Sequence, residues 1–354
     1  MPEQLDHEQT VEALLRSGKP PHFLAMDQSR GTHVKHFKQF GIEVDDATFD
    51  AKGNAAREML ATTPGLSDYF EAAIVHDDLY QLTAPDGQPL RSALEDQGIL
   101  VIGKKLGLDS QTGLATEMDS LEAEMAKLVE IGVHLIKTRT TAKVNLPQYV
   151  EDAADQMVEV QRLAAKNGKI SAILEPEFDI KSPGTLAQRE DLMVRLLGRM
   201  LKRIRQEGLG NHPFAVKTSF PTAGKPGKDY EEPIEPEASA ASFRRLCGRA
   251  QIPEELFIVF LSGGHSSVVS RQLLQSMGDV RGNVGSSFSR ANVEEPYRAT
   301  FSGGTIDMQA GHNAMLKQGL LNELAVRGAY KPEYENAKTY EEVWNLPEVQ
   351  KVMR

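Results

Sequence analysis

The chain has 354 residues, 40% of them hydrophobic and 25% charged, which is typical of a globular protein with a large core. Its 50 acidic and 40 basic residues give a formal net charge of -10, which argues against a nucleic-acid or anionic-membrane partner. A single cysteine, no signal-peptide pattern and no stretch of about 18 apolar residues predict a reducing, cytoplasmic location without an internal disulfide or a membrane span.

Eight short apolar runs recur in chain order, at residues 22–26, 72–75, 99–102, 133–137, 170–174, 214–217, 257–261 and 284–288. Most are continuously apolar, as in strands buried on both faces of a parallel sheet. Helical spacing of apolar residues fills most gaps, at 118–131, 147–168, 186–207, 238–250, 266–277 and 310–327. Eight such units predict an α/β fold, a single-domain (β/α)8 TIM barrel. An open doubly wound sheet is the alternative, but no G-x-G-x-x-G follows the first strand.

We expect the barrel to span residues 1–330 and a C-terminal helical extension, residues 331–354, to pack on it. Within that extension, residues 339–354 predict one charged helix. Segments 222–238 and 301–311 are rich in Gly, Pro or charge and are expected to be loops. Solvated connectors are the simpler interpretation of these loops. A lid over the mouth of the barrel is the functional one.

Polar residues at the C-terminal ends of the predicted strands should meet at the mouth of the barrel, where such folds carry their chemistry. They are Asp27, Lys137, Arg139, Glu175, Glu177, Lys217, Ser262 and Arg290. Lys217 emerges from an apolar strand, so burial and the charge of Lys137 favour the free amine that forms Schiff bases. A strand-end lysine that reaches water or pairs with a carboxylate is the alternative.

Glu175 and Glu177 flank Pro176 and should face the same side of their strand. Two neighbouring carboxylates in different environments can divide acid and base roles, or they can simply pair with the lysines. Asp27 can orient a lysine or move a proton at a substrate hydroxyl, and the turn that follows it, including Ser29, can donate to a phosphate.

A phosphate site is predicted where the loops after strands 7 and 8 meet. Glycines let the backbone approach an anion, and a helix N-terminus offers free N–H groups. A tight turn with a surface arginine is the alternative. The residues of this predicted site are Ser262, Gly263, Gly264, Ser287, Ser289 and Arg290. Arg139 is a candidate for a second phosphate or a substrate hydroxyl.

The nine histidines form no convincing metal site, so we expect neither a metal nor another cofactor. His33 and His36 have H-x-x-H spacing, but they have no further ligand nearby in the sequence and are expected to be structural. Cys247 lies in a predicted helix and is expected to be a small core residue.

Taken in order, these segments resemble the class I (Schiff-base) fructose-bisphosphate aldolases, most closely the bacterial branch, over about residues 20–295. The motifs are FLAMDQSRG at 23–31, DDLYQ at 77–81 with Asp86-Gly87, IKTR at 136–139, LEPE at 174–177, VKTSFP at 216–221, FLSGG at 260–264 and SFSRA at 287–291. Each motif is short, but each falls in the right order on a predicted strand or the loop after it.

The resemblance implies a role for each matching residue. Lys217 would form the iminium with C2 of a ketose, and Glu175 would act as acid and base in that step. Asp27 would take the proton of the C4 hydroxyl, or orient that hydroxyl, as the C3–C4 bond breaks. Lys137 would supply positive charge, and Glu177 would sustain the network. The C1 phosphate would be held by the residues after strands 7 and 8, and the distal end of the substrate by Ser29 and Arg139.

The resemblance also implies metal-independent cleavage of fructose 1,6-bisphosphate into dihydroxyacetone phosphate and glyceraldehyde 3-phosphate, in glycolysis and gluconeogenesis. Relatives carry a lysine after the third strand, where IGKKLG at 102–107 offers Gly103 or, in a shifted register, Lys104. His36 stands where animal-type members have an arginine, the chain lacks their C-terminal tyrosine, and the loop 225–235 is longer than usual.

Three other functions stay open on the sequence alone. They are Schiff-base cleavage of another phosphorylated ketose (tagatose 1,6-bisphosphate or a monophosphate), a non-catalytic barrel that binds a sugar phosphate, and a metal-dependent aldolase. The expected partner is a small phosphorylated sugar, with no nucleic acid and no membrane. A homo-oligomer is compatible with the resemblance, but the sequence does not fix the number of subunits.

Overall fold

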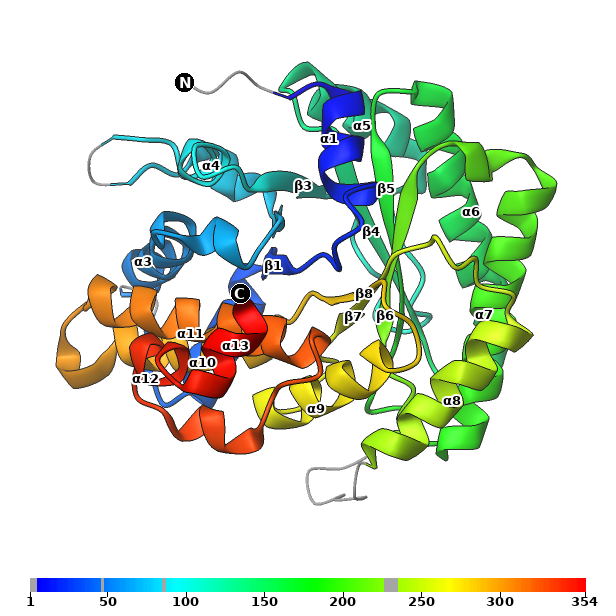
Figure 1. Cartoon of the computed structure of the whole chain (residues 1–354). Helices are drawn as coiled ribbons and strands as arrows, with labels where there is room; N and C mark the ends of the chain where they lie inside the picture. Colours follow the sequence, from blue (N-terminus) through cyan, green and yellow to red (C-terminus); the bar gives the residue numbers. More distant parts are fainter. Residues whose placement is uncertain (1–4, 46–47, 85–86, 226–234) are drawn as a thin grey trace.

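Eight parallel strands form a barrel in the computed structural model, which describes residues 5–45, 48–84, 87–225 and 235–354 (Figure 1). The strands pair in chain order from β1 to β8. A parallel bridge between His22 and Ser286 joins the last strand to the first. This closure confirms the predicted TIM barrel and excludes the alternative fold, an open doubly wound sheet. The strands are β1 (Phe23–Met26), β2 (Ala72–Val75), β3 (Leu100–Lys104), β4 (Leu135–Ala142), β5 (Ser171–Phe178), β6 (Phe214–Ser219), β7 (Ile258–Leu261) and β8 (Val284–Ser286).

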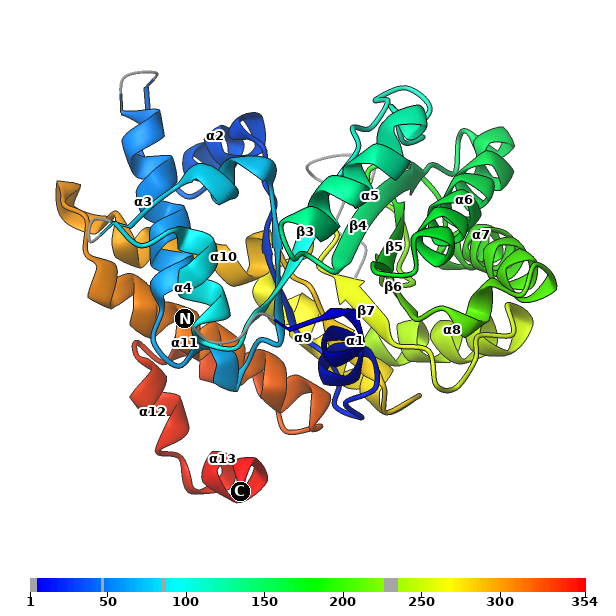
Figure 2. The same ribbon diagram turned by 90° about the horizontal axis from the view of Figure 1, so that it is seen from above.

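Helices surround the strands, as the view from above shows (Figure 2). In the first half of the chain they are α1 (His7–Leu15), α2 (Arg30–Gln39), α3 (Phe49–Thr62), α4 (Leu90–Glu95), α5 (Leu121–Glu130) and α6 (Val150–Asn167). In the second half they are α7 (Leu186–Gln206), α8 (Pro236–Arg249), α9 (Ser267–Gly278), α10 (Arg290–Thr300), α11 (Met308–Val326), α12 (Tyr340–Trp344) and α13 (Pro347–Met353). Six of these lie where helical spacing predicts them, from α5 to α9 and at α11.

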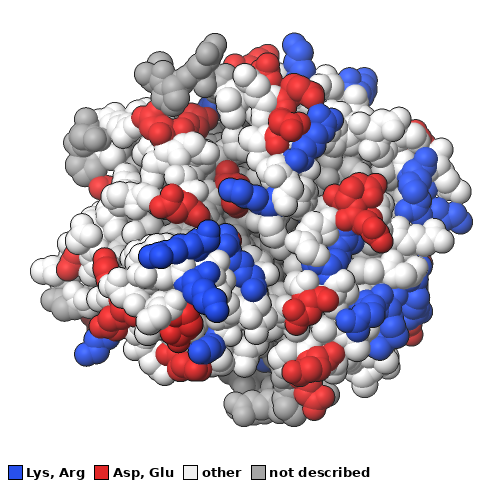
Figure 3. Space-filling model, in the orientation of Figure 1, with Lys and Arg blue, Asp and Glu red and all other residues white. Residues whose placement is uncertain are grey.

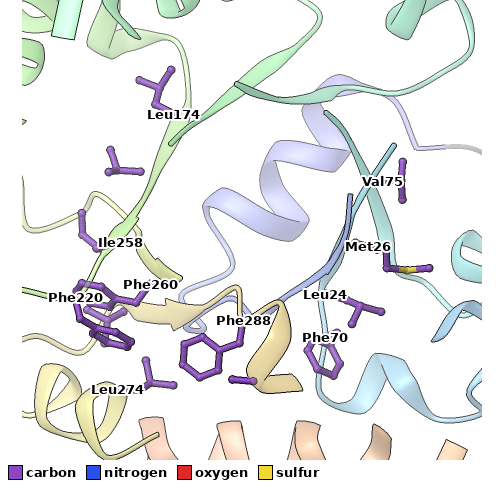
Figure 4. Close-up of a cluster of buried hydrophobic side chains, with 14 of the residues drawn as sticks. Leu24, Met26, Phe70, Val75, Leu174, Phe220, Ile258, Phe260, Leu274 and Phe288 are labelled. Atoms are coloured by element: carbon purple, nitrogen blue, oxygen red, sulfur yellow. The ribbon is translucent and has the colours of Figure 1, made fainter. Parts of the chain in front are cut away.

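The strands separate two apolar layers, because successive side chains point to opposite faces. Outward-facing residues such as Leu24, Leu174 and Phe260 pack against the helices in the larger layer, part of which Figure 4 shows. Inward-facing residues such as Phe23 and Ile74 form a smaller cluster inside the barrel. Both layers are fully buried, which explains why the strands read as continuous apolar runs.

Helix α1 closes the N-terminal end of the barrel, although no helix was predicted there. Asp6 caps it by accepting a hydrogen bond from the Gln9 N–H at 2.9 Å, and the Gln9 side chain accepts one in return from the Asp6 N–H. Leu14 packs into the interior apolar cluster. The helix therefore covers the end of the barrel opposite to the C-terminal ends of the strands.

The predicted single helix at 339–354 is wrong in one respect, since two short helices, α12 and α13, take its place. Leu346, with φ -67° and ψ 128°, is extended directly before Pro347. A residue before proline is disfavoured in the α conformation, so the helix breaks there. Both helices pack on α11 and lie away from α6 and α7 (Figures 1 and 2). The division of the chain at residue 330 stays a prediction.

Charges of both signs are mixed on the surface, as Figure 3 shows for one face. Between α6 and α7, for example, Arg199 Nε lies 2.7 Å from Asp155 Oδ1. Exposed pairs of this kind contribute little to stability, but they keep the surface solvated. No helix in the part of the chain that the structure describes is long and apolar enough to cross a membrane.

Candidate active site

Charged side chains form the upper layer of the barrel interior. The interior apolar cluster includes, on four neighbouring strands, Ile102, Leu135, Ile173 and Ala215. A residue two positions beyond an inward-facing one faces inward too. Two positions further along the same strands stand Lys104, Lys137, Glu175 and Lys217. The interior therefore changes from apolar to charged over one step of the pleat, towards the C-terminal ends of the strands.

Two strands extend further than the sequence predicts. The strands β4 and β5 pair over eight residues, from Leu135 opposite Ser171 to Ala142 opposite Phe178. Lys137 and Glu175 consequently lie inside strands, not at their ends. Lys217 likewise lies inside β6. The sequence places each strand end where the apolar run ends, because an inward-facing charge interrupts that run before the strand is complete.

Lys137 lies at the centre of a buried ion cluster. Its Nζ is 2.8 Å from Asp27 Oδ2 and 2.6 Å from Glu175 Oε2. Lys217 Nζ lies 3.3 Å from the other carboxylate oxygen, Glu175 Oε1. The side chains of both lysines and of Glu175 are at most 4% exposed, and that of Asp27 is 14% exposed. Glu175 thus bridges the two lysines, and four predicted site residues meet in one cluster.

The two lysines differ in how readily they lose a proton. Burial lowers the pKa of Lys217, and repulsion from Lys137 lowers it further, against the attraction of Glu175. Burial acts on Lys137 as well, but Asp27 and Glu175 outweigh it and raise the pKa of Lys137. Lys217 is therefore the lysine poised to become a free amine, while Lys137 keeps its charge.

The two glutamates of β5 also differ. Burial alone would raise the pKa of Glu175, but Lys137 and Lys217 outweigh it and hold the pKa below its usual value. For Glu177 burial prevails and raises the pKa, because Arg139 compensates only in part. Arg139 Nη1 lies 3.3 Å from Glu177 Oε2. Glu175 thus stays ionised, whereas Glu177 protonates more readily.

The loops after β7 and β8 meet as predicted. Arg290 Nη2 donates a hydrogen bond to the carbonyl oxygen of Gly264. Gly263 and Gly264 have φ values of +57° and +91°, which favour glycine. Ser287 Oγ is buried and has no hydrogen-bond partner within the described residues. Ser289 is the N-cap residue of α10, whose first N–H groups can bind an anion.

Of the two positions that the sequence offers for a lysine after the third strand, Gly103 and Lys104, only Lys104 faces the ion cluster. Gly103 faces outward, where an added Cβ would come within 2.7 Å of Leu128 Cδ2 in α5. Lys104 pairs in register with Lys137 and faces the ion cluster. Burial lowers the pKa of Lys104, and Lys137 adds to this effect, against the attraction of Asp27. Alternate residues of a strand share a face, so an inward-facing Ile102 implies that Lys104 faces inward too.

Ser29 and His36, which the sequence links to the distal end of the substrate, differ in how exposed they are. Ser29 is exposed at the start of α2, where its Oγ lies 3.2 Å from Thr32 Oγ1. His36 is buried in α2 with its ring stacked on Phe40, and burial followed by the charge of Arg290 lowers the pKa of His36 to about 4. His36 is therefore neutral at pH 7. Residues 226–234 of the loop 225–235 lie outside the described residues.

Two cavities of the described structure lie away from the ion cluster. One, of about 690 Å³, lies between α4, β3 and the end of α5, and the other, of about 720 Å³, lies between α8 and the start of β8. No three His, Cys, Asp or Glu residues among those described are arranged to hold a metal ion. Cys247 is half-buried, and burial raises the pKa of its thiol.

Together, the fold and the cluster define a (β/α)8-barrel protein with a lysine–carboxylate centre. A family model described as "Fructose-bisphosphate aldolase class-I" matches residues 6–348, and the chain belongs to that family. The chain is 27% identical over 325 residues to fructose-bisphosphate aldolase 3, chloroplastic, of Arabidopsis thaliana, covering 88% of this chain and 81% of that one.

Bacterial proteins match as well. The chain is 24% identical over 337 residues to a probable fructose-bisphosphate aldolase class 1 of Xanthomonas campestris, covering 91% of this chain and 98% of that one. This match supports the predicted relationship to the bacterial branch. Among solved structures, fructose-bisphosphate aldolase from Plasmodium falciparum, in complex with TRAP and a small-molecule inhibitor, superposes with a TM-score of 0.78 at 21% identity. The superposition covers 92% of this chain and 95% of that one, and it supports the barrel fold.

Proposed function

We propose that the protein cleaves fructose 1,6-bisphosphate, and forms it in the reverse direction, through a Schiff base on Lys217. The observation that carries this proposal is a buried lysine with a lowered pKa, 3.3 Å from a carboxylate that a second lysine keeps ionised. The products are dihydroxyacetone phosphate and glyceraldehyde 3-phosphate. A buried amine of this kind is the nucleophile that Schiff-base chemistry needs.

Bond formation begins with the free amine of Lys217. Its nitrogen attacks C2 of the open-chain ketose, and the carbonyl oxygen takes up a proton to give a carbinolamine. Loss of that oxygen as water leaves a protonated imine. Glu175, within 3.3 Å of the amine, carries the protons of both steps. Lys137 remains charged beside Glu175 and stabilises its carboxylate form.

Cleavage follows from the positive charge on the imine. The Asp27 carboxylate takes the proton of the C4 hydroxyl, and the C3–C4 electron pair moves towards the imine nitrogen. Glyceraldehyde 3-phosphate leaves, and an enamine remains on Lys217. A proton returns to C3, and water then hydrolyses the imine to release dihydroxyacetone phosphate and the free lysine.

Two anion sites would hold the ends of the substrate. The C1 phosphate would bind at the N-terminus of α10 and the loop after β7, through Ser262, Gly263, Gly264, Ser287, Ser289 and Arg290. The distal end would bind near Lys104 and Arg139, with Ser29 contributing from the first loop. Two observations support this assignment: the buried Ser287 hydroxyl has no hydrogen-bond partner among the described residues, and Lys104 faces inward.

Steady-state cleavage of three sugars tests the proposal. Fructose 1,6-bisphosphate, tagatose 1,6-bisphosphate and fructose 1-phosphate are compared at pH 7 in the presence of EDTA, with Lys217→Met as the inactive reference. The highest kcat/KM is expected for fructose 1,6-bisphosphate. A higher value for either of the other sugars would replace the substrate and keep the chemistry. No cleavage of any sugar would contradict the proposal and favour a non-catalytic barrel. Three expectations about this protein stay predictions: its role in glycolysis and gluconeogenesis, its cytoplasmic location and its number of subunits.

A further inference from the structure

Gln28 joins the first loop of the barrel to the last. It follows Asp27 directly, and only 5% of its surface is exposed. Its side-chain nitrogen, Nε2, lies 2.6 Å from the carbonyl oxygen of Ala25 and 2.7 Å from Ser289 Oγ. One buried amide therefore connects β1, the strand that leads to Asp27, to the N-cap residue of α10.

The direction of both hydrogen bonds follows from simple chemistry. A carbonyl oxygen only accepts, so the atom facing Ala25 must be the amide nitrogen of Gln28, and the amide cannot be flipped. That nitrogen has two protons. One is donated to Ala25 and the other to Ser289 Oγ. The Ser289 oxygen is consequently an acceptor in this bond, and its own proton is free to be donated elsewhere.

The rest of the Gln28 side chain agrees with this orientation. Its oxygen, Oε1, is buried and has no hydrogen-bond partner within the described residues. Among the described residues, the hydrogen bonds of this amide are therefore the two that its nitrogen donates. These two bonds fix the orientation of the Gln28 amide and, with it, the direction of the hydrogen bond at Ser289.

We propose that Gln28 is a positioning residue that aims the Ser289 hydroxyl proton at the C1 phosphate. The inference rests on the proposed function, because it assumes that a phosphate binds at the start of α10. Without Gln28, the hydroxyl can rotate and donate to a protein carbonyl or to water. With Gln28, the hydroxyl is already a donor when the phosphate arrives, so less of the binding free energy is lost in ordering it.

A double-mutant cycle tests this assignment. Gln28→Met keeps the length of the side chain and removes both donors, and Ser289→Ala removes the hydroxyl. Because a hydrogen bond to a charged group is involved, each single change is expected to raise the KM of fructose 1,6-bisphosphate by roughly tenfold. If Gln28 acts through Ser289, adding Gln28→Met to Ser289→Ala raises KM no further. KM is expected to change more than kcat.

The choice of substrate separates positioning from a general structural role. In the condensation direction, Gln28→Met is expected to raise the KM of dihydroxyacetone phosphate, which carries the C1 phosphate, and not that of glyceraldehyde 3-phosphate. Equal effects on both substrates, additive effects in the cycle, or an unchanged KM would overturn the proposal. Should Gln28→Met fail to fold, Gln28→Leu serves instead, because its side chain is also apolar and has no donor.

The failure of the proposed function would look different. If the wild-type protein cleaves no ketose phosphate, the proposed function is wrong. Ser289 then has no C1 phosphate to bind, whatever the variants show. If the wild-type protein cleaves fructose 1,6-bisphosphate and Gln28→Met has the same kinetics, the proposed function stands. Only the positioning role of Gln28 is then wrong.

Discussion

The charge of Lys137 controls the protonation of its neighbours in the ion cluster. Removing it in Lys137→Met takes away the repulsion that helps to lower the pKa of Lys217, so that pKa rises. We expect the acid limb of the pH–rate profile to move to higher pH, and kcat to fall on the order of a hundredfold.

Lys105→Met is the matched control for this variant. Lys105 neighbours Lys104 in sequence, but its Nζ pairs with Asp77 and Glu124 at 2.7 and 2.8 Å, away from the cluster. Its pH–rate profile should match that of the wild type. An unchanged acid limb in Lys137→Met would mean that Lys137 does not set the pKa of Lys217.

Lys104 is expected to act on the distal phosphate alone. In Lys104→Met, the KM of fructose 1,6-bisphosphate should rise by roughly tenfold or more, because a charge-assisted contact is lost. The KM of fructose 1-phosphate, which lacks the distal phosphate, should change little. Steady-state kinetics with both sugars measures this, and equal effects on the two would exclude a distal role.

Glu175 links the stability of the fold to pH. Its pKa is lowered in the folded state, so its contribution to stability is present above the unfolded value of about 4.5 and is lost as pH falls through the folded value. At pH 7 we expect Glu175→Gln to reduce the free energy of unfolding by about 3 kcal/mol, since two buried lysines lose a partner.

Urea unfolding between pH 7 and pH 3 measures this linkage. The difference in the free energy of unfolding between the wild type and Glu175→Gln should become smaller as pH falls, because a protonated Glu175 is as uncharged as glutamine. A gap that stays constant with pH would contradict the assigned charge state.

At the scale of elements, α1 should matter more to stability than its position suggests. Leu14 is fully buried in the interior cluster, so Leu14→Ala should lower the free energy of unfolding by about 2–5 kcal/mol. Leu5→Ala is the control, because Leu5 is 38% exposed and its loss should change stability by less than about 0.5 kcal/mol. Urea unfolding compares the two, and similar values would show that α1 does not seal the barrel.

Some elements were visible in the sequence and others were not, for physical reasons. The eight strands follow from continuous apolar runs, because both of their faces are buried. The true ends of β4 and β5 do not, because Lys137 and Glu175 face inward and interrupt the apolar pattern. Helix α1 escaped prediction because it is short and polar, although Asp6 and Gln9 form a capping box. The break before Pro347 was readable from the proline itself.

At the scale of the whole molecule, the closed barrel brings residues distant in sequence into one site. Asp27 and Lys137 are 110 residues apart in the chain and 2.8 Å apart in space. Chain order and strand spacing predict that they share a mouth, since parallel strands end on the same side. The charge states within the cluster could not be predicted from sequence, because they depend on distances and burial that only the fold fixes.

Borohydride trapping tests the central claim most directly. The protein is incubated with dihydroxyacetone phosphate and EDTA, reduced with borohydride and digested, and the modified lysine is identified by mass spectrometry. Lys217→Met and Lys105→Met are treated in parallel. We predict one adduct, on Lys217, in the wild type and in Lys105→Met, and none in Lys217→Met. An adduct on Lys137 or Lys104, or no adduct while the wild type still cleaves the sugar, would contradict the assignment of Lys217 as the nucleophile.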